Sequence, residues 1–250
     1  MQRTGNPALG KKTFEIARSG SGDVMTISGT VNKTFALILL LLASAVWSWN
    51  EAMVVGPWGS EPVIPGWYLP MLIGGLVIGF VIIFKKTTAP VLAPVYAVCE
   101  GMLIGTISAL YETRFQGIVL QAGLLTIGVL LALLIAYRSG MIKVTENFKL
   151  GVVAATGGIA IVYLIDLGMR FFGMQMPLLH ENSPMGIAIS LGIVVIASLN
   201  LVLDFDFIEQ GAARGAPKYM EWYAGFGLLV TLIWLYLEIL RLLSKTKSRN

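Results

Sequence analysis

The sequence predicts an all-α integral membrane protein with seven transmembrane helices. Of its 250 residues, 56% are hydrophobic and only 13% are charged, and the mean hydropathy is +0.78. Soluble domains of this length are far less apolar. Apolar stretches of about 17 to 25 residues recur along the chain, and each is long enough to cross a hydrocarbon core of roughly 30 Å.

Seven such stretches are separated by short breaks that carry Pro, Gly or charged residues. We place the spans at 32–49, 67–84, 91–111, 117–137, 150–172, 185–207 and 221–243. Within the second and third spans, Gly75 and Gly79, and then Gly101 and Gly105, have the spacing that lets helix backbones approach closely. Ordinary helix contact within the chain explains both motifs without a dimer.

Residues 1–30 are polar, basic and rich in Gly and Ser, and 19–23 resembles a flexible linker. We interpret 1–30 as a flexible basic cytoplasmic arm and 31–250 as a single transmembrane domain. The arm is too long for the basic end of a signal peptide, and no small-residue cleavage site follows the first span. The first span is therefore expected to stay in the membrane.

Basic residues favour an amino terminus on the cytoplasmic side. With that orientation, the arm and the cytoplasmic connections hold most of the Lys and Arg, while the opposite connections hold only Arg114 and Arg170. The basic tail at 245–249 disagrees, because seven crossings place it outside. Either the tail is a tolerated exception or one stretch does not fully cross, and we favour the exception.

Composition argues against several classes of function. A single Cys99 cannot form an intrachain disulfide, and a lone His180 cannot build a histidine cluster, so haem and zinc sites are not expected. The net charge of +4 belongs to loops and tails, so it does not indicate nucleic-acid binding. The acids lack the Gly-x-Gly-Asp context of intramembrane proteases, and no P-loop is present. We expect neither an enzyme nor a bound cofactor.

The sixth span ends in a group of acids. A charge in the membrane costs about 2.5 to 3.5 kcal/mol, so an intramembrane carboxylate is a functional candidate. Asp204 follows Asn200 by one turn and shares its helix face, whereas Asp206 lies about 200° further round. The alternative to a functional role is that Asp204 is simply a carboxylate at a helix end, in the headgroup region. Asp206 is nearer the end of the helix, and contact with solvent explains its charge.

The seventh span supplies a second acid, Glu238, among apolar residues. Arg241 is three residues further on, so the two side chains can pair on one helix. That pairing is one interpretation of Glu238. The other is that it approaches Asp204, with Arg241 as the counter-charge.

Two further positions carry charge inside predicted spans. Glu100 lies about ten residues into a helix entered through Pro90 and Pro94, so it is well inside the bilayer. Asp166 and Arg170 are four residues apart and are expected to form a structural pair on one helix.

Paired carboxylates suggest a chemistry. Two such groups in a low-dielectric interior cannot both stay ionised cheaply, so they share a proton and titrate as a unit. When deprotonated, they offer the hard oxygen ligands that calcium prefers. Such a pair is a pH switch and a transient calcium site.

The whole chain resembles the Bax inhibitor-1 family, also called the transmembrane Bax inhibitor motif family. The resemblance rests on the seven spans, the run from Glu100 to Gly105, the acid ending the sixth span and Leu235-Tyr-Leu-Glu238 in the seventh. The opening Arg3-Thr-Gly-Asn-Pro-Ala-Leu9 is similar to the bacterial branch. The resemblance implies six helices around a central carboxy-terminal helix, in a bacterial inner membrane.

The resemblance also implies pH-sensitive calcium leak controlled by two acids on the last two helices, here Asp204 and Glu238. Two features depart from the pattern. The span Tyr68 to Phe84 has no arginine to latch an acid. Asp204 is near the cytoplasmic end of its helix while Glu238 is about 15 residues into the next, so the two miss by roughly 10 Å unless the last helix starts late.

Two functions follow as hypotheses. The first is a pH-regulated calcium leak channel or transporter, with Asp204 and Glu238 as the switch and transient calcium ligands, Glu100 as an acid along the ion pathway, and Asn200, Asp206 and Arg241 in support. Its partners are membrane lipid, calcium and protons. The second is a non-conducting modulator that binds a membrane protease or another membrane protein through the basic arm.

Overall fold

A computed structural model describes residues 23–56, 59–174 and 176–249 of the chain. The elements are α2 (Ile27–Ala52), β1 (Met53–Gly56), β2 (Gly59–Pro62), α3 (Tyr68–Phe84), η2 (Lys86–Thr88), α4 (Ala89–Arg114), α5 (Ile118–Arg138), α6 (Glu146–Phe171), α7 (Pro177–His180), α8 (Pro184–Ala213) and α9 (Met220–Arg249). Six of these helices are long and apolar enough to span a membrane, and α3, at 17 residues, is shorter. The predicted all-α membrane fold is confirmed.

Local signals explain where the helices begin and end. Thr26, Thr145 and Ser183 cap α2, α6 and α8 by accepting a backbone N–H with the side-chain oxygen. Gly173 and Gly215 follow α6 and α8 with positive φ angles of 72° and 66°, the conformation that commonly ends a helix. Compared with the predicted spans, α2, α4, α8 and α9 extend further at both ends, whereas α3, α5 and α6 differ from them by a few residues at most.

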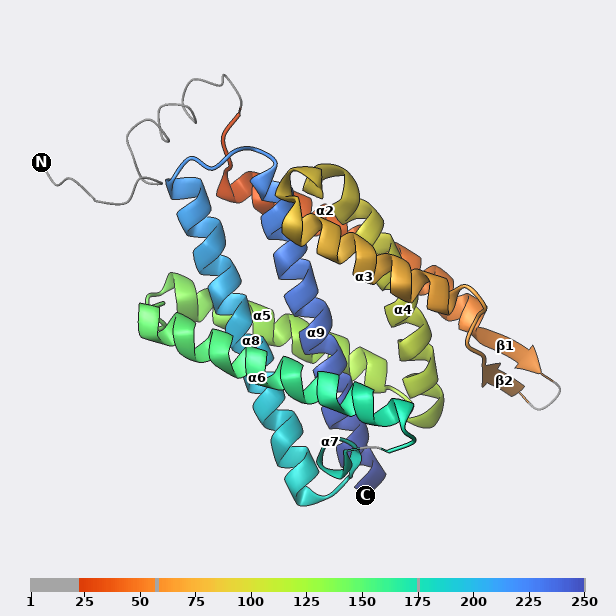
Figure 1. Cartoon of the computed structure of the whole chain (residues 1–250). Helices are drawn as coiled ribbons and strands as arrows, with labels where there is room; N and C mark the ends of the chain where they lie inside the picture. Colours follow the sequence, from red (N-terminus) through yellow and green to blue (C-terminus); the bar gives the residue numbers. More distant parts are fainter. Residues whose placement is uncertain (1–22, 57–58, 175, 250) are drawn as a thin grey trace, which may run out of the picture.

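The last helix is the centre of the bundle, as predicted. α9 packs against α2, α4, α5 and α8, and Figure 1 shows it passing between these helices. Its side chains contribute to two apolar clusters, with Phe226 and Leu229 facing α2, α3 and α4 and with Leu235 and Leu240 facing α5 and α8. The two clusters therefore join the two sides of the molecule through one helix.

The bundle has two ends that we name by what lies there. At the arm end, Val24 forms a β-bridge with Pro217 in the α8–α9 connection, and Lys86 lies 5.2 Å from the ring centroid of Tyr223. The α3–α4 connection and the start of α9 therefore lie together. The hairpin end holds β1 and β2, which pair antiparallel with Met53 opposite Pro62. The sequence suggested only a break here, and the hairpin was not predicted.

The segment before α2 is not a free arm throughout. Residues 1–22 lie outside the described part of the chain. The backbone N–H of Met25 donates to the Ala216 carbonyl at 2.7 Å, and that of Lys218 donates to the Asp23 carbonyl at 3.1 Å. Met25 is buried between α8 and α9. Backbone pairing therefore holds the last part of the predicted arm, 23–26, against the α8–α9 connection.

The carboxy-terminal tail lies at the hairpin end, opposite the start of α2. Lys245 donates to the Gly186 carbonyl at 3.1 Å and to Ser190 Oγ at 2.8 Å, and Lys247 donates to the Gln116 carbonyl at 3.1 Å. These charges are held by helix and loop carbonyls, unlike the free cations of a flexible loop. The ammonium groups of Lys245 and Lys247 are therefore bound within the chain, while the side of the membrane on which the tail lies stays a prediction.

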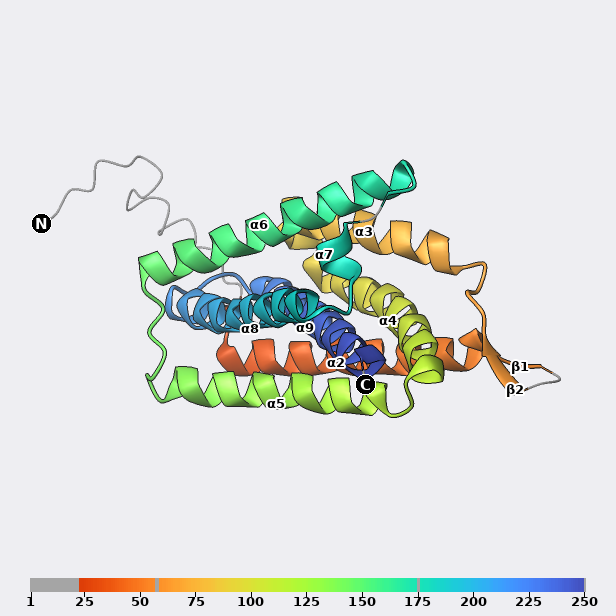
Figure 2. The same cartoon turned by 90° about the horizontal axis from the view of Figure 1, so that it is seen from below.

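The two Gly-x-x-x-Gly motifs make contacts within the chain. A Cβ atom on Gly101 would collide with Ser44 and the Leu41 carbonyl of α2, and one on Gly105 would collide with the Ala45 carbonyl. Gly75 and Gly79 of α3 face α4 less tightly, since a Cβ there would stand 3.2 Å from Glu100 and 3.4 Å from Tyr96. The α2–α4 contact therefore requires glycine, and Figure 2 shows these two helices crossing.

We predict that Gly101→Val lowers the free energy of unfolding by about 1 to 3 kcal/mol, because the new side chain must displace the α2 backbone. Unfolding in detergent measures the change. Gly128→Val on α5 is the control, since a Cβ there meets nothing within 4 Å. Equal losses in both variants would contradict the close contact.

Candidate functional site

Asp204 is a partly buried acid with one fully enclosed carboxyl oxygen. Its Oδ2 atom is buried without a hydrogen-bond partner among the residues that the structure describes. The hydroxyl of Thr231 on α9 interacts with the carboxyl group. One turn earlier on α8, Asn200 donates to Thr156 Oγ1 of α6 at 2.8 Å. The face of α8 that was predicted to be functional is therefore turned toward α6 and α9.

Glu238 is also buried, at 2% exposure, but it is fully partnered. Tyr163 of α6 donates its hydroxyl to the carboxylate at 2.7 Å, and the Trp234 indole donates at 3.3 Å. The Arg241 guanidinium lies 3.2 Å from Glu238 Oε1, donates to the Tyr163 hydroxyl, and stands 5.1 Å from the Tyr163 ring centroid. We call Tyr163, Glu238 and Arg241 the α9 triad. The predicted pairing on one helix is confirmed.

The two acids of the predicted switch do not lie together. Asp204 is level with Thr231, and Glu238 is seven residues, or about 10 Å, further along α9. Met220 begins α9, close to the predicted start at 221, so no late start shortens this offset. Glu238 is instead directed to α6 and its own helix. The expectation that the pair shares one proton directly is corrected by this offset.

Glu100 forms a third, separate environment between α3 and α4. The Tyr96 hydroxyl hydrogen-bonds to its carboxylate, and a Cβ on Gly75 would stand 3.2 Å from Glu100 Oε1. The small Gly75 makes room for the carboxylate against α3. Glu100 is half-buried, and no hydrogen bond or ion pair joins it to Asp204 or Glu238 in the described residues.

The remaining predicted charges have structural partners. Asp206 lies 3.0 Å from Lys149 of α6 and accepts from Gln210 at 2.5 Å, so it ties α8 to α6 and is only partly open to solvent. The pair of Asp166 and Arg170 is confirmed at 3.1 Å. Asp166 also accepts the backbone N–H of Met176 at 3.0 Å, which holds the loop after α6.

A further buried acid, Glu221, was missed by the sequence analysis. Its side chain is fully buried, and it is ion-paired with Lys33 and with Lys218, the latter at 3.3 Å. Its Oε1 atom also accepts the backbone N–H and the hydroxyl of Thr26, at 2.9 and 3.0 Å. Only the three-residue spacing of Lys218 and Glu221 could have indicated this cluster, because its other members lie almost 200 residues earlier.

The described part of the chain contains no group of three or more His, Cys, Asp or Glu side chains that could hold a metal ion. The acids instead form four separate environments along the bundle. Glu238 and Glu221 are satisfied by donors and cations, whereas Asp204 keeps a buried carboxyl oxygen without a partner among the described residues.

Comparison with known proteins identifies one relationship. The sequence model of the family described as Bax inhibitor 1 like matches residues 6–248, nearly the whole chain. No curated protein matches the sequence.

We predict that Arg241→Gln lowers the free energy of unfolding by about 3 kcal/mol, because it leaves Glu238 buried without a cation. Adding Glu238→Gln should recover part of that loss, which denaturant unfolding in detergent measures. Arg249→Gln, at an exposed position on the same helix, is the control and should change stability little. A double variant less stable than Arg241→Gln alone would contradict the α9 triad.

Proposed function

Because this chain belongs to the Bax inhibitor 1 like family of membrane proteins, we propose that it is a pH-regulated calcium leak channel or transporter in which protonation of Asp204 controls conduction. The observation that carries the proposal is the buried carboxyl oxygen of Asp204 without a partner. Channel-type or modulator roles suit the family in general. The calcium selectivity and the pH control are the parts that need testing.

The physical argument concerns the two protonation states of Asp204. An ionised carboxylate in an apolar interior is costly unless cations or several donors surround it. Thr231 supplies one hydroxyl, so the tightly packed arrangement suits the neutral acid. An arrangement that admits water between α8 and α9 suits the ionised form. Proton uptake by Asp204 and hydration of this helix interface are therefore linked.

The α9 triad has a different role in the proposal. Glu238 carries its counter-charge with it, since Arg241 is on the same helix and Tyr163 bridges both groups. Because the Glu238 and Arg241 charges cancel, a change at Asp204 need not alter the triad. It fixes α9 against α6 while the α8–α9 interface changes, and its carboxylate becomes a calcium ligand only if Arg241 leaves.

Calcium enters the proposal as the transported ion and as a transient ligand of carboxylate oxygens. Ionised Asp204 is the oxygen donor that an ion meets between α8 and α9. Glu100 is proposed as a second acid along the pathway, on the α3 side of α4, where Tyr96 holds it. No catalytic step and no resident cofactor are part of this proposal.

For localisation we propose a bacterial inner membrane with the arm end in the cytoplasm. The cations at that end support this orientation; they include Lys33, Lys86, Arg138, Lys143, Lys149, Arg214 and Lys218. At the hairpin end, Lys245 and Lys247 donate to protein carbonyls, so they contribute less to a free positive surface.

We predict that purified protein in liposomes leaks calcium with a pH dependence across about pH 5 to 8. Asp204→Asn should abolish this dependence and fix the flux at the native level measured at the acidic end, because Asn mimics the neutral acid. The measurement is calcium flux against pH for both proteins.

Two controls separate Asp204 from its neighbours. Asp206→Asn removes an acid two residues away that pairs with Lys149, and the double variant Glu238→Gln/Arg241→Gln removes a charge pair with no net charge. Both should keep the native pH profile. A native profile in Asp204→Asn would refute its control of conduction. Flux no greater than that of empty liposomes would refute the channel and favour the modulator that acts through the arm.

A further inference from the structure

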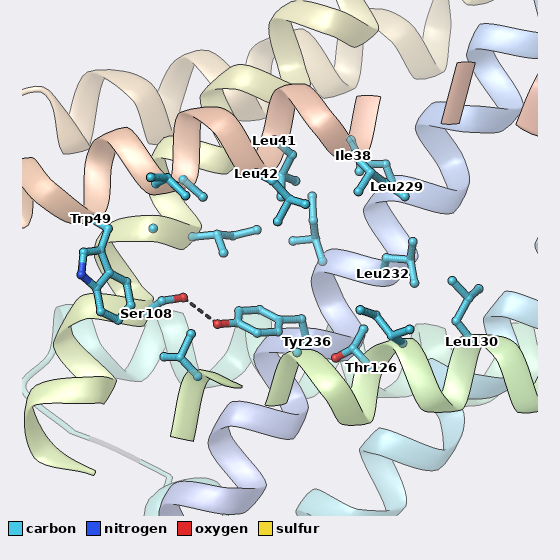
Figure 3. A pocket seen from close by; sticks show the side chains of 18 of the residues that line it. Ile38, Leu41, Leu42, Trp49, Ser108, Thr126, Leu130, Leu229, Leu232 and Tyr236 are labelled. Atoms are coloured by element: carbon cyan, nitrogen blue, oxygen red, sulfur yellow. Dashed lines mark hydrogen bonds between the residues drawn. The ribbon is translucent and has the colours of Figure 1, made fainter. Parts of the chain in front are cut away.

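A long apolar crevice runs between α2 and α5, with α9 as its floor, as Figure 3 shows for the half nearer the hairpin end. That half has a volume of about 550 Å³, and the half nearer the arm end has about 720 Å³. Ile38, Leu130 and Leu232 line both halves. The two cavities therefore adjoin along the bundle, and together we call them the crevice.

The interior of the crevice offers little to water. The Ser108 and Tyr236 hydroxyls bind each other at 2.7 Å, as Figure 3 shows, and the Thr126 hydroxyl donates to the Ala122 carbonyl at 2.8 Å. These polar groups are already paired, and aliphatic side chains line most of the remaining wall of this half. In the half nearer the arm end, Thr34 Oγ1 is a single buried hydroxyl without a hydrogen-bond partner among the described residues. An apolar occupant therefore suits the crevice better than an ion or a polar solute.

The crevice opens sideways toward the bilayer. Leu42 and Val46 of α2 and Ile127 and Leu131 of α5 line it, and each is half or more exposed. Both helices are membrane spans, so their exposed apolar faces contact lipid tails. The α5 residues that line the crevice run from Val119 to Arg138. This stretch of helix is about 28 Å long. It is therefore longer than one leaflet, which is half of a hydrocarbon core of roughly 30 Å.

The arm end of the crevice is charged. Arg138 ends α5 and Lys143 follows in the α5–α6 connection; both line the crevice, and neither forms an ion pair with a described residue. Two acids share this mouth, but Asp206 is paired with Lys149 at 3.0 Å and Glu209 accepts from the Tyr137 hydroxyl at 2.5 Å. Two unpaired cations thus face one uncompensated acid.

We propose that this crevice is a binding site for one anionic phospholipid. One acyl chain lies between α2 and α5, and the phosphate lies between Arg138 and Lys143. The crevice combines an apolar slot that is open to lipid with a net positive mouth at one end. An anionic phospholipid matches this arrangement, because its apolar chains are joined to a negatively charged headgroup. The site does not depend on ion conduction, so it stands or falls independently of the proposed channel.

Native mass spectrometry of delipidated protein in detergent tests the site, with phosphatidylglycerol and phosphatidylcholine of identical chains as probes. The native protein should retain one phosphatidylglycerol in preference to phosphatidylcholine. Arg138→Gln/Lys143→Gln should lose that preference, at about fivefold weaker binding for each charge removed. Lys85→Gln, an exposed cation outside the crevice, should behave like the native protein.

Two glycines of α5 provide a matched test of the slot. A Cβ on Gly123 or Gly128 meets nothing within 4 Å, but only Gly123 lines the crevice. Gly123→Phe should lose retention of both lipids, and Gly128→Phe should retain them; thermal unfolding confirms that both are folded. Retention without headgroup preference in the native protein, or full retention in Gly123→Phe, would overturn the proposal.

Discussion

A charge placed in an apolar bundle must find its partner within the protein, and this constraint fixes the position of α9. Three charged side chains along this helix are almost completely buried: Glu221 near its start, Glu238 in its last third, and Lys245 near its end. Each reaches a different neighbour, since Glu221 pairs with Lys33 of α2, Glu238 accepts from Tyr163 of α6, and Lys245 donates to Ser190 of α8. Removing one partner of a buried ion pair is strongly destabilising, so these contacts set both the depth and the rotation of the helix.

Asp204 is conspicuous because it departs from this rule. The buried carboxylates of Glu221 and Glu238 receive several donors and a cation, whereas Asp204 keeps one oxygen without a partner among the described residues. The bundle has rigid contacts on α9 and one unsatisfied acid on the neighbouring α8. Proteins retain such a group at a cost to stability, and a functional site is the usual place where that cost is tolerated.

The features predictable from the sequence are those encoded over short distances. Seven runs of apolar residues indicate seven helices, and Asp166 and Arg170 form the pair that their spacing of four residues indicates. The offset between Asp204 and Glu238 follows from the helical rise alone. Glu221 could not be matched to Lys33, because 188 residues separate them and neither position carries a local pattern. The hairpin of β1 and β2 lacks the alternating hydrophobicity that predicts strands, and the crevice between α2 and α5 depends on how two distant helices are spaced by α9.

The short α3 gives the protein an uneven hydrophobic perimeter. Its 17 residues span about 25 Å, while a typical hydrocarbon core is roughly 30 Å thick. α8 and α9 have 30 residues each and meet no such shortfall. Hydrophobic mismatch is therefore confined to one side, where the bilayer must thin or polar residues at the helix ends must reach outward, at a cost of a fraction of a kcal/mol per Å. Elastic deformation of the membrane is thus concentrated beside α3, and thin bilayers accommodate this molecule with the least distortion.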